Sequence, residues 1–288
     1  MRSLFSFLAA VVLFYTTASA KDGSMITDSL RYRGNTYTYH LYRPANLPDN
    51  APLVVMFHGY GSRSKPERYG LNDVADRHGF AVCYPRGPKD FKGKPCWNVG
   101  YEFHRERKWR RDDAGFACRL VRHLQREYGF SRDNTFATGH SNGGEMCYLL
   151  AYLHPEVFAA VAPISGLTME WMYRELSAKK PISLFEIHGT NDRTSLWEGD
   201  PENSGGWGKY ISVPSAIGYW RAVNRCTHEV SEELPLKRNR VIAHKYIGGT
   251  DGNEVWLYEI VDGGHSWADK DLNVGEHIWR FFARHLKK

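Results

Sequence analysis

Long apolar runs and recognisable metal-binding patterns are both scarce in this sequence. Its 288 residues have a mean hydropathy of −0.52. After the first 15 residues no apolar run approaches the roughly 20 residues that the core of a bilayer requires. The spacings of the five cysteines match no zinc or haem motif, and there is no HExxH pattern, internal repeat or low-complexity tract. We therefore expect no membrane span in the mature chain, no bound metal and no repeat architecture.

The N-terminal segment has the three-part layout of a secretory signal peptide. Arg2 is followed by an apolar run to Phe14 and by small residues at Ala18 and Ala20. We expect cleavage after Ala20, which leaves residues 21–288 as a single domain, secreted or periplasmic. A membrane anchor is the alternative, but the run is too short to span a bilayer. The first cysteine, Cys83, is too far from the expected cleavage point to carry a lipid.

Five cysteines in an exported chain form at most two disulfides and leave one thiol over. The sequence does not assign the pairing among Cys83, Cys96, Cys118, Cys147 and Cys226. Cys147 lies in a very apolar helical segment, so we interpret it as a small buried side chain rather than a nucleophile.

Positive charge is in slight excess, with 38 Lys and Arg against 32 Asp and Glu, a net charge of +6 and a pI near 9.0. The densest cluster lies in residues 104–111. We interpret it as solvated loop charge, partly paired with Glu102 and Glu106. No nucleic-acid-binding motif surrounds it, so we expect no nucleic-acid partner.

Apolar strand-like runs alternate with helix-like segments along the chain. Continuous apolarity is typical of parallel strands that are covered on both faces. The strand-like runs are residues 53–57, 80–84, 135–138, 158–164, 182–187 and 255–261, and the predicted helices cover residues 112–128, 144–153, 213–224 and 274–286. Residues 30–42 alternate around an Arg33-Gly34-Asn35 turn, which predicts an antiparallel hairpin. We expect an α/β-hydrolase fold, with a mostly parallel central sheet, helices on both faces and this hairpin at one edge.

A Gly-x-Ser-x-Gly motif, Gly139 to Gly143, follows one strand-like run and begins a helix-like run, the context of a nucleophile elbow. Downstream, HGTND ends at Asp192 and DGGHSW contains His265. The order Ser, Asp, His is that of the α/β-hydrolases. A serine hydroxyl needs a base to become a nucleophile, so Ser141, His265 and Asp192 are predicted as nucleophile, general base and orienting acid.

An anionic tetrahedral intermediate requires two backbone N–H donors. Asn142, directly after the serine, is predicted to supply one. The HGYG segment supplies the other, and we choose Tyr60 over Gly61. His58 is predicted to brace this loop by hydrogen bonds.

Two long segments, residues 85–109 and 193–212, are predicted to be irregular and to form the walls of a substrate cleft, because both follow the C-terminal ends of strands. Three tryptophans near the motifs, Trp97, Trp207 and Trp267, are candidate substrate contacts through ring stacking, although ordinary packing explains each equally well. Asp112 and Asp113 precede a helix and are interpreted as caps rather than as an acid/base pair.

These motifs resemble the carbohydrate esterases that include feruloyl and acetylxylan esterases, together with extracellular polyhydroxybutyrate depolymerases. The similarity extends from about Leu53 to the C-terminus through FHGYG, WNVG, DDAGF, ATGHSNGGEM, FAAVAPISG, HGTND, SVPSAIGYWRAVNRC and DGGHSW. The resemblance implies the same roles for the five predicted residues and no cofactor. Glu145 departs from it, because relatives often carry an apolar residue there. Its carboxylate either alters the pH dependence or faces solvent. The loop over residues 193–210 is also unlike the family's short glycine-rich segment.

We therefore expect a secreted serine esterase that removes feruloyl or acetyl groups from plant cell-wall polysaccharide such as arabinoxylan. The first alternative is a polyhydroxybutyrate-type polyester depolymerase, and the second is a peptidase that uses the same triad. A third, of another class, is a non-catalytic carbohydrate-binding protein. The sequence does not decide the acyl group, the sugar or the oligomeric state.

Overall fold

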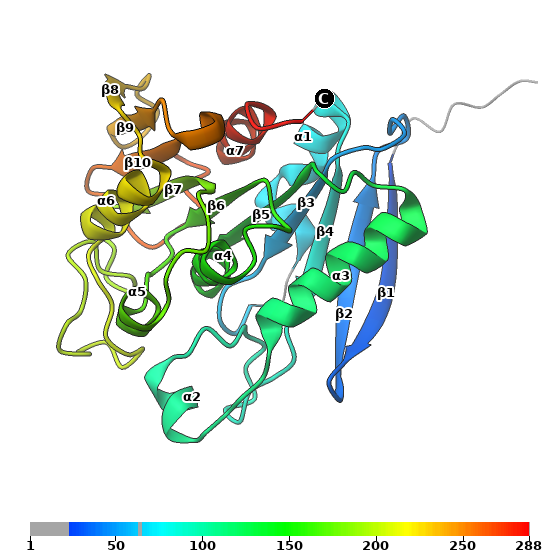
Figure 1. The fold of residues 1–288 in the computed structure, drawn as a ribbon, viewed down its shortest axis with the longest axis horizontal. Helices are drawn as coiled ribbons and strands as arrows, with labels where there is room; N and C mark the ends of the chain where they lie inside the picture. The colour runs from blue at the N-terminus through cyan, green and yellow to red at the C-terminus, as the bar shows by residue number, and fades with distance from the viewer. Residues whose placement is uncertain (1–22, 63–64, 288) are drawn as a thin grey trace, which may run out of the picture.

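One ten-stranded sheet runs through the part of the chain that the computed structural model describes, residues 23–62 and 65–287 (Figure 1). Its strand order is β1-β2-β4-β3-β5-β6-β7-β10-β9-β8. The strands are β1 (Ser24–Tyr32), β2 (Asn35–Arg43), β3 (Leu53–Phe57), β4 (Ala81–Arg86), β5 (Thr135–His140), β6 (Ala160–Ile164), β7 (Ser183–Gly189), β8 (His228–Glu233), β9 (Val241–Ile247) and β10 (Val255–Ile260). From β4 to β10 the neighbours are parallel, and at both edges they are antiparallel. The predicted fold is confirmed. The predicted signal peptide lies outside the described residues.

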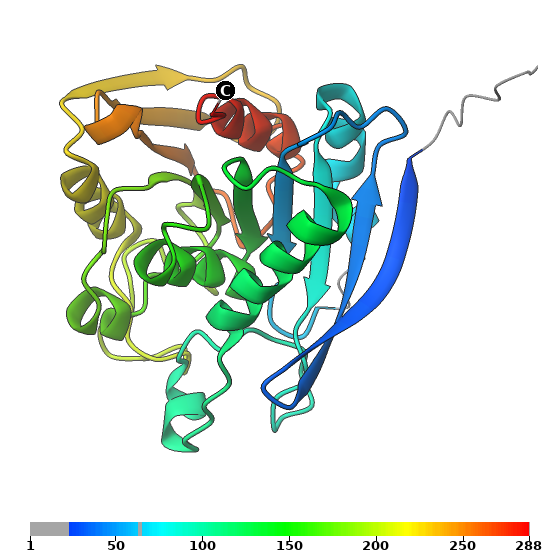
Figure 2. The same cartoon turned by 45° about the vertical axis from the view of Figure 1, so that its right-hand side comes forward.

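Helices cover both faces of this sheet, as the apolar strand runs predict. The helices are α1 (Leu71–His78), α2 (Glu102–Glu106), α3 (Asp113–Tyr128), α4 (Asn142–Leu153), α5 (Glu170–Glu175), α6 (Val213–Asn224) and α7 (Val274–Ala283), with 3-10 turns at Pro66–Tyr69 and Thr250–Gly252. Helices α3 and α4 lie over the same face (Figure 2). In β3, Leu53 and Val55 pack into the core that contains α3, α4 and α6, whereas Val54 and Met56 pack into the core that contains α1 and α7. Both faces of the strand are therefore buried.

The predicted N-terminal hairpin is confirmed as β1 and β2, paired in antiparallel register across the Arg33-Gly34 turn. The side chains of Tyr37, Tyr39 and Leu41 have no exposed surface. This alternation buries one face of β2, which is the pattern expected where only one face of a strand contacts the core.

The opposite edge of the sheet was not predicted. Strands β8 and β9 extend the sheet beyond β10 as an antiparallel ribbon, and every residue of β8 is exposed. An exposed strand of sequence HEVSEE carries no hydrophobic alternation, so the pattern gave no signal. Helices α1 and α5 were also missed, because each is a short helix with few apolar positions.

Helix α3 starts and ends as the sequence predicts. The carboxylate of Asp112 accepts a hydrogen bond from the Gly115 amide at 2.8 Å, and the helix ends at Gly129 with φ of 70°. The prediction that Asp113 caps the helix is wrong, because its buried carboxylate instead binds Arg111, Tyr37 and the Asn98 amide.

All five cysteines lie among the described residues and none is paired. Cys147 is fully buried, as predicted. In residues 23–62 and 65–287, no helix is long and apolar enough to cross a membrane.

The two predicted irregular segments both begin at the C-terminal ends of strands, the first after β4 and the second after β7. The first contains only the short helix α2. Figures 1 and 2 show α2 at the far end of a loop that extends away from the sheet. The backbone amide of Glu102 in the first loop donates to the carbonyl of Trp207 in the second at 3.0 Å, so the two segments are joined.

Candidate active site

Ser141 occupies the sharp turn between β5 and α4. Its backbone has φ of 56° and ψ of −123°, a conformation that non-glycine residues rarely adopt and that persists only where the surroundings enforce it. The flanking glycines leave no space for a side chain. A Cβ at Gly139 would lie 2.3 Å from the carbonyl oxygen of Gly143, and a Cβ at Gly143 would lie 2.0 Å from that of Phe57. The predicted elbow geometry is therefore present.

Asp192 and His265 come together because β7 and β10 are parallel neighbours, and each residue follows the end of its strand. The Nδ1 of His265 lies 2.7 Å from Oδ2 of Asp192. The other oxygen of Asp192 accepts hydrogen bonds from the amides of Thr194 and Ser195, each at 2.8 Å. Burial opposes ionisation of Asp192, but the hydrogen bond and charge of His265, with these amides, hold its pKa below the usual value. An ionised Asp192 only accepts, so Nδ1 carries the proton and Nε2 is left as a base.

Ser141 and His265 line one cavity of about 330 Å³, together with Gly59, Tyr60, Gly61, Ser62, Arg68, Tyr69 and His140. Asp192 lies behind His265 and is 3% exposed. In the described part of the chain no direct hydrogen bond joins Ser141 to His265. Such contacts are often long before substrate binds. Burial, and then the charge of His265, lower the pKa of His140 to about 3, so this neighbouring imidazole stays neutral.

In the part of the chain that the structure describes, two backbone amides next to the cavity residues have no protein acceptor. Among the described residues, neither the amide of Tyr60 nor that of Asn142 donates to a protein acceptor, whereas the amide of Gly61 donates to the carbonyl of Pro95 at 2.8 Å. The hydrogen bonding therefore favours Tyr60 over Gly61 as the predicted second donor.

Hydrogen bonds of two side chains, His58 and Tyr60, fix the loop that carries Tyr60. His58 is buried, with Nδ1 2.8 Å from the carbonyl of Gly59 and Nε2 accepting from the amide of Gly87 at 3.0 Å. Its predicted bracing role fits these contacts. The hydroxyl of Tyr60 donates to Asp90 at 2.8 Å, which anchors the ring on the loop that follows β4.

None of the three candidate tryptophans is among the residues that line the cavity at Ser141. Trp97 has no exposed surface, and its indole N–H donates to the carbonyl of His58 at 3.0 Å. The prediction that Trp97 contacts substrate is therefore wrong for this structure, because the ring is completely buried in the core. Trp267 is 5% exposed and packs edge-on against Tyr69. Trp207 is half-buried, with its ring 5.5 Å from that of Tyr60, and it remains a candidate.

His188 is a buried residue of this region that the sequence analysis did not assign to the site. Its Nδ1 lies 2.8 Å from Oε1 of Glu186, and its Nε2 lies 2.8 Å from the carbonyl of Ser195 and 3.6 Å from Oδ2 of Asp192. Burial opposes its protonation, but the hydrogen bond and charge of Glu186 outweigh it and raise the pKa of His188. The sequence feature that could have identified His188 is its position in HGTND, four residues before Asp192.

Glu145 is also buried, at 1% exposure, so the solvent-facing alternative for this residue is wrong. The hydroxyl of Tyr101 donates to Oε2 of Glu145, and Nδ2 of Asn142 lies 3.4 Å from the same atom. The carboxyl therefore lies directly behind the predicted oxyanion residue.

Three buried side chains, Asp90, Cys96 and His104, lie close enough to share a metal ion. The carboxylate of Asp90 is already occupied, because it accepts from the Lys92 and Lys94 amides, the Tyr60 hydroxyl and Nε2 of His104. A guanidinium nitrogen of Arg111 lies 3.9 Å from the thiol of Cys96. A satisfied carboxylate and an adjacent cation disfavour a dication, so we interpret the cluster as a hydrogen-bonded support for the Tyr60 loop.

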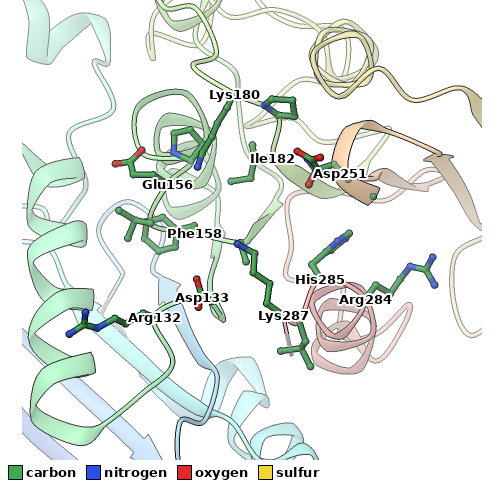
Figure 3. A pocket seen from close by; sticks show the side chains of 17 residues that line it. Arg132, Asp133, Glu156, Phe158, Lys180, Ile182, Asp251, Arg284, His285 and Lys287 are labelled. Carbon is green, nitrogen blue, oxygen red and sulfur yellow. The ribbon is translucent and has the colours of Figure 1, made fainter.

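A larger cavity of about 360 Å³ lies at the opposite end of the sheet, where β5, β6, β7 and β10 begin. Figure 3 shows basic and acidic side chains intermixed around it, including Lys180, Lys287, Glu156 and Asp251. In an open α/β sheet ligands bind beyond the carboxyl ends of the strands. The smaller cavity at Ser141 meets that condition and this one does not.

Comparison with known proteins links these features to a described family. The model of the family "Esterase PHB depolymerase" matches residues 36–185. A bifunctional acetylxylan esterase/xylanase of Neocallimastix patriciarum is 28% identical over 90% of this chain and 35% of its own length, and a poly(3-hydroxyalkanoate) depolymerase of Paucimonas lemoignei is 26% identical over 58% of this chain and 40% of its own length. The chain thus spans less than half the length of either relative. The solved acetyl xylan esterase of Aspergillus awamori superposes with a TM-score of 0.61 at 19% identity, over 91% of this chain and 99% of that one, and shares the fold.

Proposed function

The chain belongs to the Esterase PHB depolymerase family, and from this premise we propose that it is an exported serine esterase acting on acylated polysaccharide. The observation that carries the proposal is the strained Ser141 at a cavity it shares with His265, whose ring is held by Asp192. A strained serine beside an oriented imidazole is the arrangement that nucleophilic acyl transfer needs.

In the proposed mechanism, Oγ of Ser141 attacks the ester carbonyl carbon while Nε2 of His265 takes the hydroxyl proton. Asp192 stabilises the resulting imidazolium through Nδ1. The former carbonyl oxygen becomes an oxyanion, which accepts hydrogen bonds from the free amides of Tyr60 and Asn142, each worth about 3–4 kcal/mol.

Collapse of this intermediate breaks the bond to the alcohol, which leaves with the proton from His265. An acyl group remains on Ser141. Water then attacks the acyl carbon, giving its proton to His265, and the second collapse releases the acid and returns the proton to Ser141. The cycle consumes one ester and one water, and no step calls for a metal or cofactor.

The proposed substrate is an acetyl or feruloyl ester on a polysaccharide such as xylan. Three observations support it: the resemblance to carbohydrate esterases, the similarity to a relative named as an acetylxylan esterase/xylanase, and the half-buried Trp207 beside Tyr60 on the loops that flank the cavity. A partly exposed indole ring can stack on a sugar or on an aromatic acyl group.

A polyester depolymerase is the second candidate, favoured by the family model and by the depolymerase relative. The two candidates share the chemistry at Ser141 and differ in the leaving alcohol. Hydrolysis of methyl ferulate, acetylated xylan and polyhydroxybutyrate by the same preparation separates them. Release of hydroxybutyrate oligomers with no activity on either xylan-type substrate would replace the polysaccharide proposal with the polyester one.

The test of the chemistry is Ser141→Ala. The variant should keep the wild-type circular dichroism spectrum and lose about 10⁴-fold or more of its kcat on an aryl acetate, with only residual hydrolysis from binding and the free amides. Near-normal turnover by the folded variant would refute the assignment. Binding of xylan by a wild-type protein that gives no burst of product from any activated ester would favour the non-catalytic alternative.

A further inference from the structure

Glu145 lies in the first turn of α4, one turn after Ser141, and its side chain points into the protein rather than into the cavity. In the described part of the chain its carboxyl receives hydrogen bonds from two neutral donors, Tyr101 and Asn142, and forms no ion pair. Burying an unpaired charge is costly, so this environment favours the protonated acid.

The charged and titratable groups around Glu145 do not supply the missing cation. Those that face it are Tyr101 before α2, Glu186 on β7, Asp192 after β7 and Tyr210 before α6. His188 is held by Glu186 rather than by Glu145. Burial raises the pKa of Glu145 to about 8, and the negative charges of Glu186 and Asp192 add to this, against the hydrogen bonds of Tyr101 and Asn142. The group therefore titrates in a range where esterases are assayed.

Glu145 is linked to the proposed oxyanion site through Asn142. The side chain of Asn142 accepts from the Trp97 amide at 2.7 Å and donates to the Trp97 carbonyl at 3.1 Å, while Nδ2 also reaches Glu145. The backbone amide of Asn142, at the positive end of α4, is the donor aimed at the developing negative charge. An ionised Glu145 would put a second negative charge behind that donor.

We infer that Glu145 is a positioning residue for the oxyanion site: in its neutral form it supports Asn142 and preserves the positive end of α4, and on losing its proton it slows ester hydrolysis. The inference rests on the proposed esterase function. The proton lost by Glu145 goes to solvent, and no bond to substrate is made or broken by this residue.

The direction of the effect follows from where charge develops. Substrate is neutral at the ester carbonyl, and the oxyanion exists only in the transition state and intermediate. Repulsion from ionised Glu145 should therefore lower kcat and leave KM nearly unchanged. A residue with a purely structural role would not lower kcat alone while KM stays unchanged, and its effect would not depend on pH.

The first experiment measures kcat and KM on an aryl acetate from pH 6 to pH 10, corrected for spontaneous hydrolysis. In the wild type, kcat at pH 10 should be at least about tenfold lower than at pH 7, because the neutral fraction of a group with a pKa of about 8 falls about a hundredfold over this range. In Glu145→Gln, which keeps the shape and an acceptor for Tyr101, the ratio of the two kcat values should approach one. Glu127→Gln, at an exposed site on α3, is the matched control and should keep the wild-type profile.

A second variant tests the sign and is independent of whether Glu145→Gln folds. Tyr101→Phe removes a donor that stabilises the ionised carboxyl, so the alkaline decline should move to higher pH. An alkaline decline that is identical in the wild type, Glu145→Gln and Tyr101→Phe overturns the inference while leaving the esterase intact. A wild type with no hydrolysis that depends on Ser141 refutes the proposed function instead.

Discussion

The imidazole of His188 lies directly behind the carboxylate of Asp192, with Nε2 of His188 3.6 Å from Oδ2 of Asp192. Both ring nitrogens of His188 face acceptors, since Nδ1 meets Glu186 and Nε2 meets the carbonyl of Ser195. These two partners, with the hydrogen bond and charge of Glu186 that raise the pKa of His188, favour the imidazolium form that donates from both nitrogens. The proposed catalytic carboxylate is thus flanked by two imidazoles, one facing the cavity and one in the core.

The buried Glu186–His188 pair should be important for stability. His188→Asn leaves Glu186 buried without its cation and should lower the free energy of unfolding by about 3–5 kcal/mol in urea titrations. The double variant with Glu186→Gln should lose less than the sum of the two single changes, since both charges leave together. His154→Asn, which removes a solvent-exposed pair with Glu156, should cost less than about 1 kcal/mol. Equal losses at the two sites would show that burial of the pair is unimportant.

The orientation of His265 should depend on the charge of Asp192 rather than on its shape. In Asp192→Asn the retained oxygen can still accept from the Thr194 and Ser195 amides, so the turn is kept. The new amide nitrogen faces Nδ1 of His265 and stabilises the wrong tautomer. We expect kcat on an aryl ester to fall by about 10⁴-fold with a small change in stability. A loss below tenfold would exclude this carboxylate from the proposed triad.

The glycines of the elbow should not tolerate a methyl group. Gly139→Ala places Cβ 2.3 Å from a backbone carbonyl, so something in the backbone must shift, and we expect a loss of more than about 3 kcal/mol or no folded protein. Gly218→Ala, in α6 with nothing within 4 Å of the added Cβ, should instead raise stability by about 0.5–1 kcal/mol. Thermal unfolding of the two variants measures whether stability falls in Gly139→Ala and rises in Gly218→Ala. A Gly139→Ala variant as stable as the wild type would contradict the close approach of the two backbone segments.

Glu145 should make stability depend on pH in a defined window. Its pKa is about 8 in the folded protein against an ordinary 4.5, so the folded state holds the proton more tightly. Its contribution is complete below pH 4.5 and is lost as pH rises to about 8. The free energy of unfolding of Glu145→Gln should therefore rise relative to that of the wild type as pH rises, by an amount on the order of 5 kcal/mol above pH 8. Parallel stability curves for the two proteins from pH 5 to pH 9 would exclude this titration.

The central part of the fold followed from sequence patterns that are local and strong. Each parallel strand is an apolar run long enough to be recognised, and α6 spans Val213–Asn224 as predicted. The edge strand β8 and the short helices α1 and α5 were missed for the opposite reason. Their residues are held by pairing or packing with distant parts of the chain, and their own patterns are too short or too polar to show it.

The site was predictable only where a motif ties a residue to a backbone shape. Ser141 needs the glycines beside it, and that requirement is written in five consecutive residues. The burial of Trp97 and the hydrogen bond between Tyr101 and Glu145 join segments that lie 45 and 44 residues apart. The contacts of Glu186, His188 and Asp192 are close in sequence, but they form only because this segment is buried in the sheet. No spacing in the sequence encodes those distances.

By itself the sequence determined the order of the parallel strands and of the longer helices, the turn that carries Ser141, and the proposal of Asp192 and His265 as its partners, because these depend on residue types within short windows. The tertiary structure alone decided which polar groups lost contact with water. Burial depends on how the sheet arranges β5, β6, β7 and β10. Burial raises the pKa of Glu145, the contact with Glu186 raises that of His188, and loop packing engages the Gly61 amide while the Tyr60 amide has no protein acceptor among the described residues.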